Sequence, residues 1–288
     1  MAFDTTRLLA QIKLKGAIPE GRFTDQEILD VAYDVLISNI TPFLVSNRED
    51  YYVMSETQAI TASQASYSLP SRAIGQSLRE VKMIRGNQVI DLERIDLEEV
   101  TSTIQGQPNQ FYIENNELIL YPTPQTTADT LKQYFFIRPS KLVPITESAR
   151  ITAIDTGTNT ITTTDAPSGW TTADTFDLIQ GKSGFRILSQ DLTASSVATN
   201  SIVLSGIPST LVVGDYINLV EETVFPYLPT EAHSLLVHAT VAELLESIGD
   251  MNGFQAAEVR VARMMEVLES LFATRVQGAP KQLSTPLI

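Results

Sequence analysis

The chain has 288 residues, of which 43% are hydrophobic and 19% charged, as expected for a folded globular protein of about two domains. It contains no cysteine, which excludes disulfides, thiol nucleophiles and thiolate metal sites. The 34 acidic and 20 basic side chains give a net charge of −14. This excess argues against a surface that grips nucleic acid, because phosphate binding needs clustered Lys and Arg, but it is compatible with an acidic wall past which DNA moves.

No apolar run approaches the roughly 20 residues that cross a bilayer. The N-terminal residues, which include Asp4 and Arg7, lack the apolar core of a signal peptide. We therefore expect no membrane contact and an intracellular site of synthesis.

Two helices are expected near the N-terminus. A short one covers residues 5–14, with Gly16 as its stop. The second begins after Thr24, because Thr24 and Glu27 have the spacing of a capping box and are followed by apolar residues at helical period. Pro42 is expected to end or kink it.

Residues 51–139 show the patterns of strands and hairpins. One hairpin is expected over 81–92 with a turn at Gly86, and another over 111–121 with a turn at Asn115-Asn116. A further strand covers 131–137. The acidic stretch 92–103 is predicted to be a loop or a short helix.

Residues 151–179 recur at 192–220 with a constant offset of 41 and no gap. Thr158-Asn159-Thr160-Ile161 matches Thr199-Asn200-Ser201-Ile202, and Asp174 matches Asp215. Such self-similarity indicates one copied supersecondary unit. Each copy offers about three short strands, too few to be stable alone, so two copies related by a pseudo-dyad are expected to close a small barrel or sandwich, with 180–191 as the connector.

The chain becomes helical again after Pro226. Thr230 is a candidate N-cap, and turns are expected at Gly249 and at Asn252-Gly253. The last helix is expected to stop near Gly278 and to leave residues 281–288 as an extended tail. Apolar residues at spacings of three and four predict a heptad-like packing seam on this helix, made of Phe254, Ala257, Val261, Met264, Leu268 and Leu271.

These elements predict an α+β fold. N- and C-terminal helices form a helical base, antiparallel strands form a central β region, and the duplicated β-barrel or sandwich is inserted between them. The expected domains are a body of helices and central hairpins, residues 1–147 plus 221–288, and an inserted β domain, residues 148–220.

The sequence offers little material for catalysis. Gly181-Lys182-Ser183 lacks the earlier glycine of a phosphate-binding loop, because Phe176 stands there. His233 and His238, the only histidines, lie five residues apart and thus about 140° around a helix, so they cannot share one metal. Acidic runs such as Glu221-Glu222 leave a carboxylate hydrolase as an alternative, which would need two carboxylates about 5–10 Å apart. We predict no enzyme, no catalytic residue, no cofactor and no metal.

Several stretches after the N-terminal helices follow the order of a strand, a turn, a strand, a Tyr-Pro-x-Pro segment and another strand. They are residues 78–81, Gly86, 107–113, 118–124 and 134–136. This order resembles the β region of head-to-tail adaptor proteins of tailed bacteriophages.

The resemblance implies a ring of twelve copies at the head–tail junction of the virion, beneath the portal protein, with DNA passing through its lumen as cargo. The β regions would face tail proteins, such as a nozzle, tail tube or terminator. The C-terminal tail would dock on the portal through Lys281, Gln282, Leu283, Ser284, Thr285, Pro286, Leu287 and Ile288. The alternative is a tail- or capsid-associated module that recognises a host glycan or fibre through the duplicated β domain.

Overall fold

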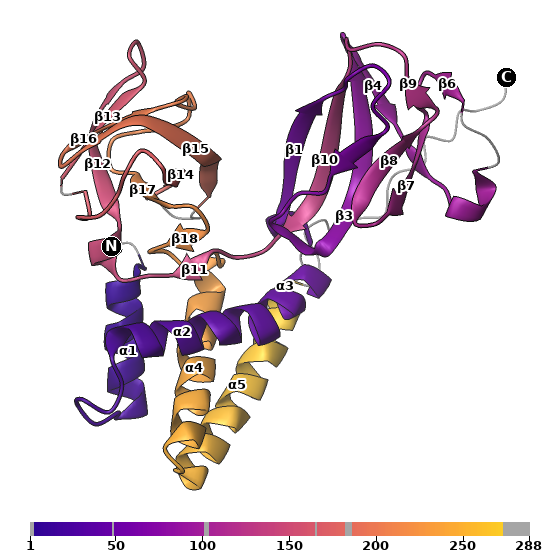
Figure 1. The fold of residues 1–288 in the computed structure, drawn as a ribbon. Helices are drawn as coiled ribbons and strands as arrows, with labels where there is room; N and C mark the ends of the chain where they lie inside the picture. The colour runs from indigo at the N-terminus through magenta and orange to yellow at the C-terminus, as the bar shows by residue number, and fades with distance from the viewer. Residues whose placement is uncertain (1–2, 48, 101–103, 165, 182–185, 273–288) are drawn as a thin grey trace, which may run out of the picture. The chain divides into compact units, whose positions relative to one another are not determined.

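The computed structural model describes residues 3–47, 49–100, 104–164, 166–181 and 186–272 (Figure 1). The chain divides into two compact units, one of residues 1–43 with 139–288 and the other of residues 44–138. The predicted α+β class, with helices from both ends of the chain, antiparallel sheets and a small closed barrel, is confirmed. The predicted domain division, with residues 148–220 as an inserted domain, stays a prediction.

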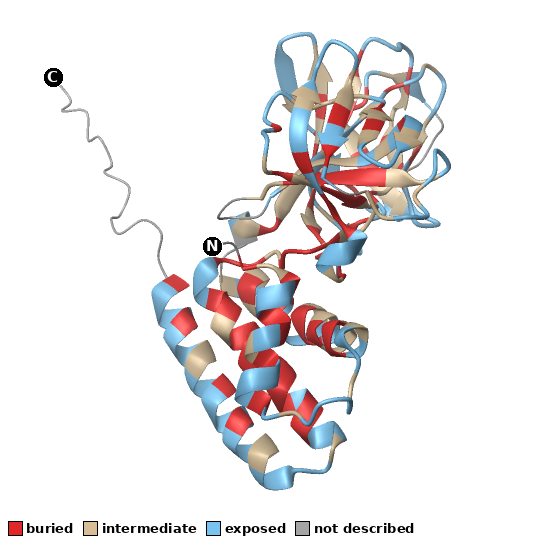
Figure 2. Cartoon of the chain, turned by 90° about the vertical axis from the view of Figure 1, so that its left-hand side faces the viewer, coloured by how far each residue is buried: buried red, intermediate tan, exposed pale blue. Residues whose placement is uncertain are grey.

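The helical part of the first unit is built around one buried helix. Helix α4 packs against α1, α2 and α5, and Figure 2 shows buried residues on its successive turns. The Phe3 ring stacks on His233 of α4, with centroids 4.2 Å apart. The helices are α1 (Thr5–Gly16), α2 (Asp25–Val35), α4 (His233–Ser247) and α5 (Met251–Phe272), with a 3-10 turn, η5 (Thr230–Ala232), before α4.

The start of α2 is confirmed as predicted. The Glu27 backbone N–H donates to Thr24 Oγ1 at 3.2 Å, and the Thr24 N–H donates to Glu27 Oε2 at 2.7 Å, which together make a capping box. Pro42 does not end the helix, because α2 continues through a π-helical segment, η1 (Leu36–Ile40), into α3 (Thr41–Asn47).

Residues Asp25–Asn47 form the one described helix that is long and apolar enough to cross a membrane by length and composition alone. Seven of its apolar residues are buried, as in a core helix: Ile28, Leu29, Ala32, Val35, Leu36, Ile40 and Leu44. Packing therefore accounts for its apolar character.

Three expected helix boundaries were wrong. Helix α1 includes Gly16, and Ala17 takes the left-handed conformation that ends it. Helix α4 starts at His233, after a 3-10 turn that contains Thr230. The turn between α4 and α5 is made by Gly249 at φ 80°, while Gly253 lies inside α5 and donates its N–H to Asp250 Oδ1 at 3.0 Å.

The second unit contains two four-stranded sheets with a shared apolar cluster. Val81, Met83 and Leu131 come from one sheet, and Phe111 and Leu118 come from the other. Both predicted hairpins are present, and Asn115 and Asn116 take the positive φ values that a tight two-residue turn requires.

The first sheet runs in the order β1 (Val53–Ala59), β10 (Thr130–Ile137), β3 (Ala73–Arg85) and β4 (Gln88–Asp91). The second runs in the order β2 (Ser66–Ser68), β8 (Glu117–Tyr121), β7 (Gln110–Glu114) and β5 (Glu93–Arg94). The short elements are η2 (Glu49–Tyr51), η3 (Leu97–Glu99), β6 (Gln105–Gly106) and β9 (Thr123–Pro124). In the first unit they are β11 (Lys141–Leu142), η4 (Ile145–Glu147) and β18 (Glu222–Thr223).

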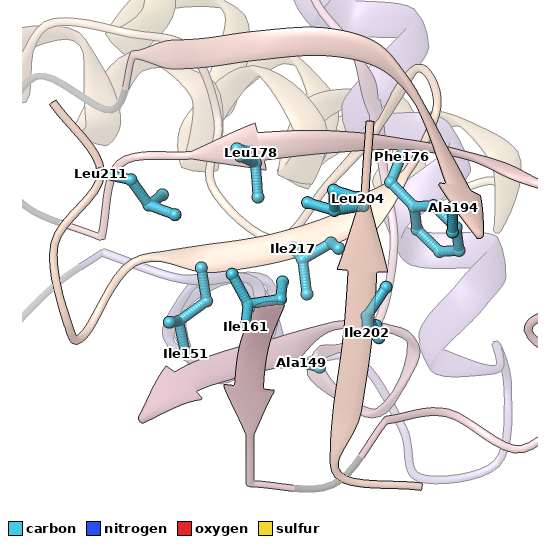
Figure 3. Close-up of a cluster of buried hydrophobic side chains, with 10 residues drawn as sticks. All are labelled: Ala149, Ile151, Ile161, Phe176, Leu178, Ala194, Ile202, Leu204, Leu211 and Ile217. Atoms are coloured by element: carbon cyan, nitrogen blue, oxygen red, sulfur yellow. The ribbon is translucent and has the colours of Figure 1, made fainter. Parts of the chain in front are cut away.

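The sequence repeat folds into a closed six-stranded barrel in which each copy supplies three strands. The first copy supplies β12 (Ala149–Asp155), β13 (Thr160–Thr163) and β14 (Thr175–Ile179), and the second supplies β15 (Ile187–Ala198), β16 (Ser201–Leu204) and β17 (Tyr216–Leu219). Side chains from both copies fill the interior (Figure 3).

The strand registers confirm the pseudo-dyad. Ile161 pairs with Ile202 in β13 and β16, and Asp177 pairs with Asn218 in β14 and β17. In each pair the two residues are 41 positions apart, which is the offset of the repeat. Exchanging the two copies therefore leaves the strand order β12-β13-β16-β15-β14-β17 unchanged.

Barrel closure brings two backbone segments too close for a side chain at Gly181. A Cβ built there would overlap the carbonyl oxygen of Gly214, and the Gly181 N–H already donates to Asp215 Oδ1 at 2.9 Å. We expect Gly181→Ala to lower the free energy of unfolding by about 2–3 kcal/mol, because the backbone must shift. Gly206→Ala is the matched control, because nothing lies within 4 Å of its added Cβ. Urea denaturation of both variants checks this, and equal midpoints would contradict it.

Candidate interaction surfaces

The predicted packing seam on α5 is partly buried against α4. Ala257, Val261 and Leu268 are buried, Phe254 and Met264 are half-buried, and Leu271 is 62% exposed. A spacing near 3.5 residues drifts around a straight α-helix, so Leu271 lies about 60° from the mean direction of Ala257, Val261 and Leu268. The predicted portal-docking residues 281–288 lie outside the described residues.

Leu271 instead belongs to a second line of residues on α5. Arg260, Arg263, Val267 and Leu271 follow one another at spacings of three and four, within about 80° of arc. We call these four residues the basic stripe. Val267 is 55% exposed, and neither arginine has a carboxylate within 4 Å among the described residues.

The basic stripe borders a groove of about 430 Å³ between α4 and α5, which we call the basic groove. Ser234, Leu235 and His238 of α4 form one wall, and Met264 and Leu268 of α5 lie in the other. The groove thus combines an apolar lining with two guanidinium groups and one carboxylate, that of Glu231, and its net positive charge suits a partner that presents apolar side chains next to carboxylates.

A second groove, of about 490 Å³, lies between α2 and α4 and is acidic. We call it the acidic groove. Its carboxylates are Glu27, Asp30 and Asp34 from α2 and Glu243 from α4, and its apolar residues are Phe23, Val31, Val35 and Leu244.

The carboxylates of the acidic groove are incompletely neutralised. Asp30 accepts an ion pair from Lys141 Nζ at 3.2 Å, whereas Asp34 and Glu243 have no cation within 4 Å among the described residues. Burial raises the pKa of Glu243, and the neighbouring Glu246 and Glu258 raise it further. The site therefore favours cationic partners.

A family comparison shows which class of protein carries these surfaces. A model of the SU10 adaptor protein family matches residues 7–285. The chain belongs to the SU10 adaptor protein family. A search of curated proteins found no match.

Membership makes this chain a bacteriophage adaptor protein and a structural component of the virion. The family match confirms that the resemblance in residues 78–136 is to phage adaptor proteins. The family is structural, which agrees with a non-enzymatic role. The described residues of this adaptor include no group of three or more His, Asp or Glu side chains placed to hold a metal ion.

The two grooves of the adaptor were not predicted from the sequence. The sequence does show two sets of residues at spacings of three and four: Glu27, Asp30 and Asp34, and Arg260, Arg263 and Val267. Such charged lines are usually solvated helix faces, and only the packing around α4 shows that each one borders a groove.

His238 forms part of the α4 wall of the basic groove, in a cationic environment. Its side chain is buried, and its Nε2 lies 3.4 Å from Lys15 Nζ. Burial lowers the pKa of His238 to about 4, helped by the charges of Lys15 and Arg260. In the folded adaptor the His238 imidazole therefore stays neutral down to about pH 4.

This environment gives the adaptor a pH-dependent stability. The unfolded chain protonates His238 near pH 6.5 but the folded chain only near pH 4, so stability falls as pH falls through that window. Between pH 7 and pH 5 the free energy of unfolding should fall less in His238→Gln than in the wild type, by about 1–2 kcal/mol. Urea denaturation at both pH values measures it. His233 is present in both proteins and cancels, and equal losses would contradict the assignment.

Proposed function

We propose that this adaptor forms a ring at the head–tail junction, docks on the portal protein and connects it to the tail. The observation that carries the proposal is the family match, which extends from residue 7 to residue 285 and so includes the helices, both β regions and most of the tail. A ring of twelve copies, implied by the resemblance, is part of the proposal.

Three features of the chain support this role. The helical part presents a basic and an acidic groove, which suit contacts with other proteins of the assembly. The tail ends in apolar residues, Pro286-Leu287-Ile288, which gain free energy when they are covered by a partner. The net charge of −14 would let DNA pass through a lumen without binding tightly to it.

Imaging of tagged virions tests the proposal. A short epitope inserted at Gly206, where nothing lies within 4 Å of an added Cβ, would be labelled with an antibody fragment and located by electron microscopy. We expect a ring of label at the junction between head and tail. Label on the capsid surface or along the tail fibres would overturn the proposal and favour recognition of a host glycan or fibre by the barrel.

A further inference from the structure

The two grooves lie on opposite sides of the same helix. Ser234, Leu235 and His238 of α4 face the basic groove, whereas Glu243, Leu244 and Ser247 face the acidic one. At 100° per residue, the mean directions of these two sets differ by about 180° around the helix axis. One chain cannot bring its own two grooves together, but a second copy can present either groove to the other.

The two surfaces complement each other in charge and in apolar content. The basic stripe carries Arg260 and Arg263, and the acidic groove carries Asp34 and Glu243, and none of the four has an ion-pair partner within 4 Å among the described residues. Two copies of a chain with net charge −14 repel each other on average. A contact between copies is therefore favoured where it sets cations against carboxylates.

We propose that the basic stripe of one copy packs into the acidic groove of the next copy. This inference rests on the proposed ring and names the surfaces that build it. The exposed Val267 and Leu271 would contact the apolar lining near Val31, and the arginines would pair with Asp34 and Glu243. Because each copy uses two different surfaces, the contact is head-to-tail, and it closes into a ring when the rotation between copies divides a full turn.

A second copy is the occupant that the chain itself argues for, because both halves of the complementary pair are present on one polypeptide. A portal or tail protein would explain one groove and leave the other without a partner. These occupants give different results in the experiments below.

Charge reversal tests the pairing. Sedimentation of the full-length chain over a range of concentrations should show self-association that weakens as salt is raised. Arg260→Glu with Arg263→Glu, or Asp34→Lys with Glu243→Lys, should each weaken it at least tenfold. An equimolar mixture of the two variants should associate again. The unchanged acidic groove of the first variant matches the unchanged basic stripe of the second, and the reversed stripe of the first matches the reversed groove of the second. Arg94→Glu in the second unit is the control and should associate as the wild type does.

Cysteine cross-linking gives a second readout in a chain that has no cysteine of its own. A mixture of Asp34→Cys and Arg263→Cys proteins should form disulfide-linked heterodimers faster than Arg94→Cys mixed with Arg263→Cys. Faster linkage of Asp34→Cys to itself would indicate a two-fold contact and overturn the proposal. Absence of both association and cross-linking in the wild-type background would overturn it as well.

The proposed function fails separately from this inference. Rings that persist in both reversal variants would overturn the pairing while the ring adaptor stands. Loss of portal binding in Asp34→Lys with Glu243→Lys, with unchanged self-association, would assign the acidic groove to the portal and overturn the pairing. Label away from the head–tail junction would instead refute the proposed function, whatever the surfaces that join the copies.

Discussion

Replacing Asp177 by alanine is expected to lower the free energy of unfolding by about 3–5 kcal/mol, because it removes a buried acceptor of two backbone hydrogen bonds. The Asp177 side chain is fully buried. Its Oδ1 accepts from the Asp191 N–H at 3.1 Å, and its Oδ2 accepts from the Glu221 N–H at 3.1 Å. Asp191, at an irregularity of β15, and Glu221, in a turn, have φ values of 56° and 60°, so the carboxylate stabilises two segments in a conformation that side-chain-bearing residues disfavour.

Asp177→Asn is the matched variant for this prediction. It introduces the residue that the repeat places at Asn218, keeps the volume and retains one carbonyl oxygen as an acceptor. We expect it to cost about half as much as alanine. Urea denaturation followed by tryptophan fluorescence measures both, since Trp170, the single tryptophan, packs against Phe176 beside Asp177. Losses below about 1 kcal/mol in both variants would contradict this role.

The barrel shows how much a repeat can predict. Matching residues 151–179 to 192–220 predicted three strands per copy and a pseudo-dyad, and the register places that dyad at Ile161–Ile202 and Asp177–Asn218. The role of Asp177 could not be predicted, because its donors follow it by 14 and 44 positions, Asp191 at an irregularity of β15 and Glu221 in a turn. The partners of a buried polar group depend on the closed fold rather than on local sequence.

The helix boundaries show where local signals compete. Gly249 and Asn252-Gly253 are both turn-formers, and they lie within five residues of each other. Gly249 forms the turn because Asp250 caps the next helix, and this cap places Asn252 and Gly253 inside the first turn of α5. The capping box at Thr24 has no such competitor, and its prediction is confirmed.

The two grooves could not be predicted from the sequence, for a different reason. Each groove is bordered by two helices, and the acidic one joins Asp34 of α2 to Glu243 of α4, about two hundred positions later. Periodicity predicts which residues share a helix face, but not which helix lies beside that face. The exposure of Leu271 illustrates this, because its spacing fits the predicted seam while its direction fits the basic stripe.

Deletion of residues 281–288 is expected to weaken binding to the portal protein at least a hundredfold while leaving the stability of the fold unchanged. The deleted segment ends in Leu287 and Ile288, and burying one such side chain contributes about 1.5–3 kcal/mol. Burying two such side chains therefore contributes more than the roughly 2.7 kcal/mol that corresponds to a hundredfold change in affinity. The last buried side chain among the described residues is that of Phe272, so the deletion removes none of the described core.

Calorimetric titration of the portal with wild-type and shortened adaptor measures the affinity, and urea denaturation checks the fold. Leu287→Ser with Ile288→Ser should reproduce most of the loss, because it removes the apolar side chains and keeps the length of the tail. Lys281→Ala should change the affinity no more than a few-fold, since an exposed charge pair contributes about 1 kcal/mol or less. Wild-type affinity in the shortened chain would refute portal docking through the tail, and equal losses in the serine and Lys281→Ala variants would refute its apolar basis.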